Sequence, residues 1–125
     1  MLVDTDVLIW HLRGYPKATL RLDQLSSPIL SAITYLELVQ GVRNKAEIVA
    51  VQKSLAMRQA NILPLTPAIT ARATMLMEEL TLSHGLQLAD ALIAATALEH
   101  ELELLTANTK HYLAISGLRL ERFEP

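Results

Sequence analysis

The sequence contains no cysteine, which excludes disulfide bonds, thiol catalysis and cysteine metal sites. No apolar run approaches the roughly 18 residues that span a membrane. The first residues include Asp4 and Asp6, where a signal peptide would carry lysine or arginine. These absences together favour a cytoplasmic protein.

Neither sign of charge is in excess, since 11 basic and 13 acidic side chains leave a net charge of −2. A protein that coats nucleic acid through bulk charge would be strongly basic. One tryptophan, one phenylalanine and three tyrosines are too few for a base-stacking platform. No glycine-rich phosphate loop is present, which excludes a nucleotide-binding Rossmann enzyme. If the chain handles nucleic acid, it needs a local basic surface or metal ions.

Short apolar runs alternate with helical patterns along the whole chain, and 51% of the 125 residues are hydrophobic. Without repeats or linker-like stretches, a single domain over residues 1–125 is expected. The expected strands, separated by helices, are residues 2–3, 29–33, 62–65, 104–105 and 118–123. Strands that alternate with helices predict an α/β fold with three layers and a mainly parallel sheet.

Isolated polar residues follow the ends of several predicted strands. Asp4 ends the first strand, Glu37 and Asp90 fall in the first turns of helices, and Asn108 follows the strand at residues 104–105. Carboxyl ends of parallel strands and amino ends of the following helices share one edge of a sheet, where ligands bind. The pattern therefore predicts that four sequence-distant polar groups meet at one edge.

Each of these residues also has a structural explanation. Asp4 could cap the first helix, and Asn108 could be a turn residue. Thr34 and Glu37 match a capping box at the start of a helix. Asp90 could complement the helix dipole. Asp90, however, opens an apolar segment without a nearby lysine or arginine, and burying an unpaired carboxylate is costly. Clustered carboxylates without basic neighbours favour Mg²⁺ or Mn²⁺.

Four sequence blocks resemble the PIN domain and, more narrowly, VapC-type toxins of bacterial type II toxin–antitoxin systems. They occur in the family's order across essentially the whole chain. The blocks are MLVDTDVLI (residues 1–9), TYLEL (34–38), GLQLADALIA (85–94) and LTANTKHY (105–112).

The resemblance implies a PIN-like, Rossmann-like three-layer sandwich and a metal-dependent endoribonuclease. It also implies a homodimer, inhibited by a cognate VapB-like antitoxin. Asp4, Glu37 and Asp90 match the three acids that hold Mg²⁺, for which Mn²⁺ is the expected substitute. Asn108 matches the fourth position, which is often Asp in the family, and Thr106 matches the Thr or Ser beside it.

Thr5 and Asp6 match the turn that follows the first acid, whose last residue supports the site more often than it binds metal. The expected reaction is hydrolysis of RNA, with tRNA as one candidate, by a metal-activated water. Cationic contacts would come from the rim, namely from Arg13, Lys17, Arg43, Lys45 and Lys110. The four histidines lack a metal-binding spacing and are interpreted as surface or helix-packing residues.

Two other classes of function compete with this one. A phosphorylatable receiver domain needs a phosphoacceptor Asp after its central strand, but that strand runs into Thr66-Pro67 here. A catalytically weakened PIN domain, acting only as a binding or dimerisation module, stays open because Asn108 replaces an acid. The presence of Asp4, Glu37 and Asp90 counts against it.

Overall fold

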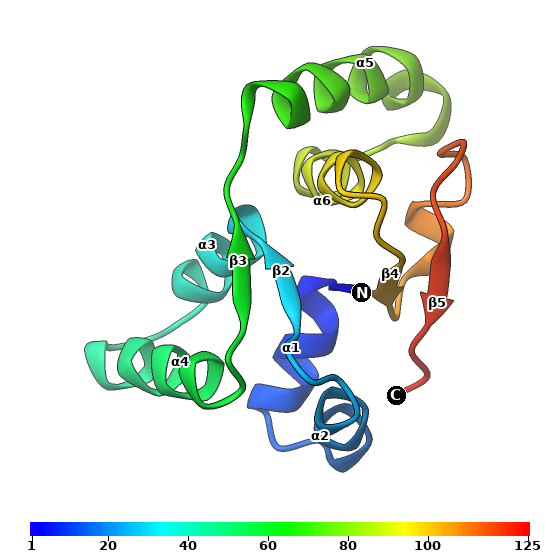
Figure 1. Cartoon of the computed structure of the whole chain (residues 1–125). Helices are drawn as coiled ribbons and strands as arrows, with labels where there is room; N and C mark the ends of the chain where they lie inside the picture. Colours follow the sequence, from blue (N-terminus) through cyan, green and yellow to red (C-terminus); the bar gives the residue numbers. More distant parts are fainter.

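The sheet at the centre of the molecule has five strands, all parallel, in the order β3-β2-β1-β4-β5. The computed structural model describes all residues, 1–125, and Figure 1 shows the arrangement. The predicted parallel sheet is therefore confirmed. The strands are β1 (Leu2–Val3), β2 (Ile29–Ser31), β3 (Asn61–Leu63), β4 (Leu104–Thr106) and β5 (Leu120–Arg122).

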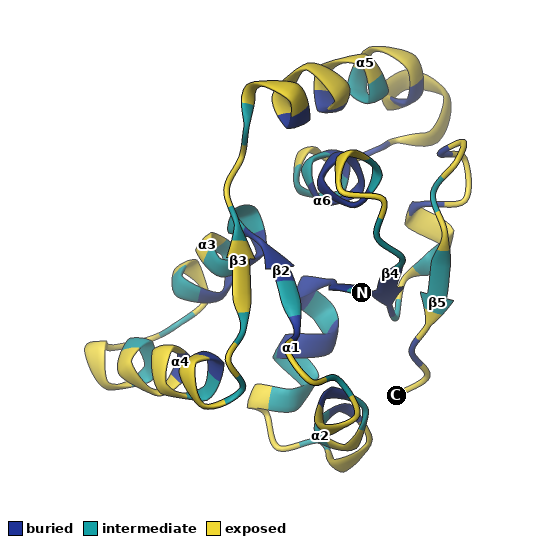
Figure 2. Cartoon of the chain, viewed as in Figure 1, coloured by how far each residue is buried: buried dark blue, intermediate teal, exposed yellow.

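Helices cover both faces of this sheet, as the three-layer prediction requires. They are α1 (Thr5–Leu12), α2 (Pro16–Asp23), α3 (Ala32–Gln40), α4 (Lys45–Met57), α5 (Pro67–His84) and α6 (Leu88–Glu99), with the 3₁₀ turn η1 (Thr109–His111) after β4. Side chains alternate between the faces of a strand. Leu2 and Leu104 accordingly join a core cluster with α5 and α6, whereas Val3 and Leu105 join one with α1 to α4. Figure 2 shows β1, β4 and most of β2 buried between these helices, whereas the edge strands β3 and β5 are more exposed.

Local sequence signals account for most helix ends. Thr66 caps α5 by accepting a hydrogen bond from the Ile69 amide, and Pro67 occupies the first helical turn. Gly85 ends α5 in the left-handed conformation, which glycine adopts without steric cost. Both features were predicted from the sequence.

One predicted helix start is wrong. Helix α3 begins at Ala32 rather than Thr34, because Ser31 at the end of β2 caps it by accepting from the Ile33 amide. Thr34 therefore lies inside the helix and is fully buried. Because α3 begins two residues earlier than predicted, Glu37 lies beyond the first turn, which contains no acid, and the predicted capping box of Thr34 and Glu37 does not form.

Helix α6 is the buried helix that its apolar sequence predicts: Ala91 and the stretch from Ile93 to Ala97 are buried. It packs against α5 and brings Asp90, in its first turn, to the carboxyl edge of the sheet. None of the helices combines the length and the apolar character needed to cross a membrane.

The order of the strands determines where the site forms. From β1 the chain adds β2 and β3 on one side, and then β4 and β5 on the other. Ligands bind to open parallel sheets at such a reversal, outside the carboxyl ends of the strands. Val3 is paired with Leu105, so the residues that follow, Asp4 and Thr106, leave β1 and β4 side by side.

Candidate metal centre

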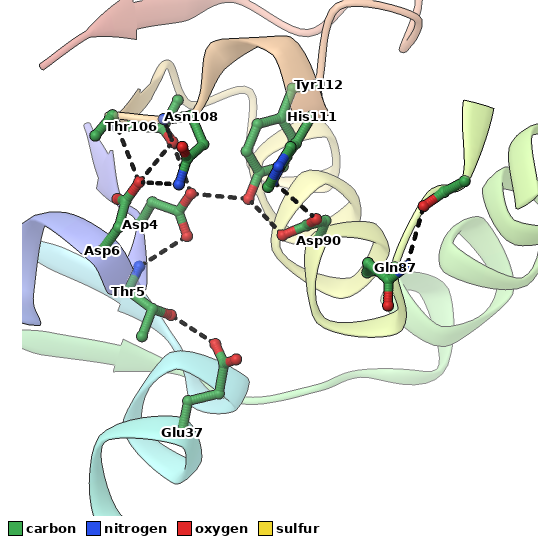
Figure 3. Close-up of polar contacts among 12 residues, drawn as sticks. Asp4, Thr5, Asp6, Glu37, Gln87, Asp90, Thr106, Asn108, His111 and Tyr112 are labelled. Carbon is green, nitrogen blue, oxygen red and sulfur yellow. Dashed lines mark hydrogen bonds and ion pairs between the residues drawn. The ribbon is translucent and has the colours of Figure 1, made fainter. Parts of the chain in front are cut away.

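Asp4 lies at the centre of the polar cluster at this edge (Figure 3). It caps α1, is 6% exposed, and its Oδ1 accepts a hydrogen bond of 2.7 Å from the Thr5 amide. Its Oδ2 accepts from the hydroxyls of Thr106, at 2.8 Å, and Tyr112, at 2.9 Å. The capping interpretation of Asp4 is thus confirmed, and the same carboxylate also faces the other predicted site residues.

Tyr112 and Thr5 connect Asp4 to the other acids, Tyr112 through its hydroxyl and Thr5 through its amide on Asp4 and its hydroxyl on Glu37. The Tyr112 hydroxyl also contacts Asp90 Oδ1, at 3.2 Å. On the opposite side, the Thr5 hydroxyl donates to Glu37 Oε1 at 2.7 Å. The structure therefore brings Asp4, Glu37 and Asp90 to one edge, as the sequence predicts, through contacts that the sequence did not predict.

Asp6 and the segment after β4 form the second half of the cluster. Asp6 Oδ1 accepts from the Val7 amide, while Oδ2 accepts from the Ala107 amide at 3.1 Å and from Asn108 Nδ2 at 3.0 Å. The Asn108 amide in turn donates to the Thr106 hydroxyl. Asp6 thereby links the start of α1 to the segment after β4 and orients the Asn108 side chain. It forms no hydrogen bond with Asp4.

Burial and mutual repulsion disfavour ionisation of two of these acids. Burial raises the pKa of Asp6 to about 6, with the charge of Asp4 as the next cause. Burial also raises the pKa of Asp90, and Asp4 adds to the shift, although His111 and the Tyr112 hydroxyl oppose it. No lysine or arginine pairs with Asp4, Asp6, Glu37 or Asp90. The cluster thus concentrates negative charge that lysine or arginine does not offset.

Tyr112 and His111 are the residues that sequence reasoning missed. His111 lies on the surface, as the sequence predicts, with 46% of its side chain exposed, but its Nδ1 also lies 3.4 Å from Asp90 Oδ2, a contact that the sequence does not indicate. The sequence alone assigns no role to Tyr112. The available signal was position alone: both residues follow Asn108 in the short helix predicted after β4, and this places them at the same edge of the sheet.

The donor set fits the chemistry of a divalent cation, since carboxylate oxygens are the ligands that Mg²⁺ and Mn²⁺ prefer. As the side chains lie, however, no three His, Asp or Glu residues converge closely enough to hold an ion. Each acid is instead held by a hydroxyl group: Asp4 by Thr106 and Tyr112, Glu37 by Thr5, and Asp90 by Tyr112.

A groove of about 690 Å³ opens beside Glu37, between α1, α3 and α4. Its lining combines apolar side chains with Arg13, Arg43 and Glu47. Arg43 and Glu47 form an exposed ion pair at 2.8 Å. Of the predicted rim cations, Arg13 and Arg43 therefore line the groove that Glu37 also borders. Lys17 lies in a separate pocket with Arg122.

Comparison with known proteins shows the family to which this chain belongs. The family model described as PIN domain matches residues 1–115. Ribonuclease VapC10 of Mycobacterium tuberculosis is 39% identical over 123 residues, which cover 95% of this chain and 90% of that protein.

Solved structures show the same fold. A toxin–antitoxin complex from Klebsiella pneumoniae contains a chain that is 32% identical, with a TM-score of 0.78, and the match covers 94% of this chain and 93% of that one. VapBC2 from Rickettsia felis, bound to a DNA fragment from its promoter, matches with a TM-score of 0.82 over 98% of each chain, at 23% identity. A family model and a relative that each match most of the chain show that it belongs to the PIN-domain family and, within that family, to the VapC type.

Proposed function

We propose that this chain is a Mg²⁺-dependent endoribonuclease of the VapC type that acts as a toxin and is neutralised by a VapB-like antitoxin. The observation that carries the proposal is the placement of Asp4, Glu37 and Asp90 along one edge of the sheet, at its switch point, without a lysine or arginine partner. The name of the Mycobacterium tuberculosis relative, a ribonuclease, supports RNA as the substrate class.

In this proposal Asp4, Asp90 and Glu37 hold the cation, with Mn²⁺ as a substitute for Mg²⁺. When bound, the ion would supply an activated water for attack on the phosphodiester and positive charge for the phosphate oxygens. Asp4 retains one unused lone pair on Oδ1, because that oxygen accepts only the Thr5 amide. Thr106 keeps Asp4 in place through its hydroxyl.

Asn108 would orient a water or a phosphate oxygen rather than hold the cation. Its side chain is exposed, and its nitrogen is engaged with Asp6, which leaves the amide oxygen to accept a hydrogen bond. Arg13 and Arg43, beside Glu37, are the cations best placed to meet the RNA backbone near the site.

Cleavage assays with purified protein test the activity. Total tRNA and ribosomal RNA would be incubated with Mg²⁺, with Mn²⁺ or with EDTA, and the cut sites mapped. We expect cleavage with either ion and none with EDTA, and no cleavage by Asp90→Asn under any condition. Cleavage that persists in EDTA would contradict the metal-dependent mechanism. Metal binding without cleavage would favour a binding module.

The groove beside Glu37 is where we expect the antitoxin to bind. Its apolar lining, which includes Ile9, Leu12 and Leu38, suits the apolar face of a protein segment. An arginine of that segment would pair with the acids in bidentate geometry. Toxin–antitoxin complexes among the structural relatives support a partner of this kind.

Co-expression with the product of the neighbouring gene tests this interaction. We expect a stable complex, which Leu12→Asp in the groove weakens. Leu82→Asp is the matched control, because Leu82 lies on α5, is 99% exposed and does not line the groove. Equal complex formation by both variants would place the antitoxin elsewhere.

The expected homodimer belongs to the same proposal. Large apolar side chains are exposed on several elements, including Leu36 on α3 and Met75 on α5, at 55% and 67%. Packing these side chains against a second copy of the chain would remove apolar surface from water. Size-exclusion chromatography with light scattering, on the chain alone, would give the mass of the assembly.

A further inference from the structure

The Tyr112 hydroxyl lies between two of the acids that we propose as metal ligands, 2.9 Å from Asp4 Oδ2 and 3.2 Å from Asp90 Oδ1. We propose that Tyr112 is a positioning residue, whose hydroxyl sets the separation of Asp4 and Asp90 and turns one oxygen of Asp4 toward the cation. The inference rests on the proposed function and deepens it.

The ring of Tyr112 is anchored firmly enough for such a role. The residue is 1% exposed and belongs to the core cluster that includes Leu2, Leu104 and Ile115. Packing of this density fixes the ring, so the position of its hydroxyl follows from the core rather than from the acids. Asp90, which is less buried than Asp4 and has fewer hydrogen-bond partners, therefore adjusts to the tyrosine.

The two oxygens of the Asp4 carboxylate differ in how many hydrogen bonds they accept. Oδ2 accepts from both Thr106 and Tyr112, which uses its two lone pairs. Oδ1 accepts only from the Thr5 amide and keeps one lone pair. Asp4 can therefore bind a cation only through Oδ1.

Asp90 depends on Tyr112 more strongly than Asp4 does. Its other polar contact is with His111, at 3.4 Å, and that side chain is nearly half exposed. The phenol carries a single hydrogen, which Asp4 Oδ2 and Asp90 Oδ1 share. Without this shared hydrogen, nothing would offset the repulsion between the two carboxylates, and Asp90 would turn away.

The test is Tyr112→Phe, which keeps the packed ring and removes only the hydroxyl. Tyr35→Phe is the matched control, since the Tyr35 hydroxyl accepts an exposed hydrogen bond from Gln52 and contacts none of the acids. Crystal structures without metal should show the Asp90 carboxylate moved away from Asp4 in Tyr112→Phe only. Calorimetric titration with Mn²⁺ should show binding weakened about tenfold in that variant.

An unchanged arrangement of Asp4 and Asp90 in Tyr112→Phe would overturn the inference, whatever the protein does with metal. Equal Mn²⁺ affinities of the wild type and the variant would also overturn it. A wild-type protein that binds no Mn²⁺ would overturn the proposed function. In that case the metal-free structures would still decide whether Tyr112 positions the two acids.

Discussion

Asn108 is hydrogen-bonded to Asp6: its side-chain nitrogen donates to Asp6 Oδ2 at 3.0 Å. This contact spans 102 residues of sequence and closes the loop after β4 onto the start of α1. Position 108 therefore influences the site through a carboxylate that already has a raised pKa, and not through Asp4.

Replacing Asn108 by Asp should make the protein less stable without metal and more stable with it. Without metal, a second carboxylate beside Asp6 loses the hydrogen bond and adds repulsion on the order of 1 kcal/mol. With Mn²⁺, the added anion offsets the charge of the ion and should tighten binding. Thermal unfolding with and without Mn²⁺, together with calorimetric titration, measures both effects.

Asn44→Asp is the control for this change, because Asn44 caps α4 through its side-chain oxygen and Asp caps helices equally well. It should alter neither quantity. If the Mn²⁺ titrations of the wild type and Asn108→Asp superimpose, position 108 lies outside the metal shell.

Asp90→Asn should abolish RNA cleavage and growth arrest of the host while leaving the fold intact. The change removes a carboxylate that burial and Asp4 make costly to ionise, so the free energy of unfolding at neutral pH should stay equal or rise. Denaturant unfolding and cleavage assays provide the two readouts. Asp23→Asn, which breaks only the surface ion pair with Arg58, should keep full activity. Growth arrest by Asp90→Asn would contradict the assignment of this acid.

The fold could be predicted from the pattern of apolar residues and from signals at the helix ends. Alternation of short apolar runs with helical patterns predicts a parallel sheet, and the cap at Thr66-Pro67 and the stop at Gly85 delimit α5. Parallel topology then requires Asp4, Glu37, Asp90 and Asn108 to share an edge. That convergence needs no knowledge of side-chain contacts, which is why it could be predicted.

The contacts within the site could not be predicted in the same way. Tyr112 reaches Asp4 across 108 residues and Asp90 across 22, and its sequence environment marks it only as a core residue. The start of α3 was placed wrongly because β2 has only three residues, too few to show a period, so Ser31 could be assigned to the strand as easily as to a helix cap. Both cases depend on tertiary packing rather than on local pattern.

Thr5→Val should weaken activity and also lower stability, because it removes the hydroxyl that lies 3.0 Å from the buried Thr34 hydroxyl. Valine keeps the shape of threonine but removes the hydroxyl that donates to Glu37 at 2.7 Å, so the Glu37 carboxylate loses its contact with the Asp4 side of the site. Loss of a contact that orients a metal ligand costs about ten- to a hundredfold in metal affinity or activity. Cleavage rates and Mn²⁺ titration measure the effect. Thr5→Ser should restore both, and a fully active Thr5→Val would show that Glu37 needs no orientation by Thr5.

Asp6 should make the metal-free protein less stable as pH rises from about 4 to about 6. Its pKa is about 6 in the folded chain and is expected near the ordinary value of 3.8 in the unfolded chain. Between these values the folded state binds more protons, so the free energy of unfolding falls with rising pH, and the full cost is present above pH 6. Because the side chain is partly exposed, we expect Asp6 to contribute about 1 to 2 kcal/mol to this fall.

Denaturant unfolding in EDTA at several pH values would be compared between the wild type and Asp6→Asn. Asparagine also loses an acceptor for the Ala107 amide, so the slopes of the two curves are compared and not their absolute values. The wild-type curve should fall more steeply between pH 4 and 6, and parallel curves would show that Asp6 is ionised as readily in the folded chain as in the unfolded one.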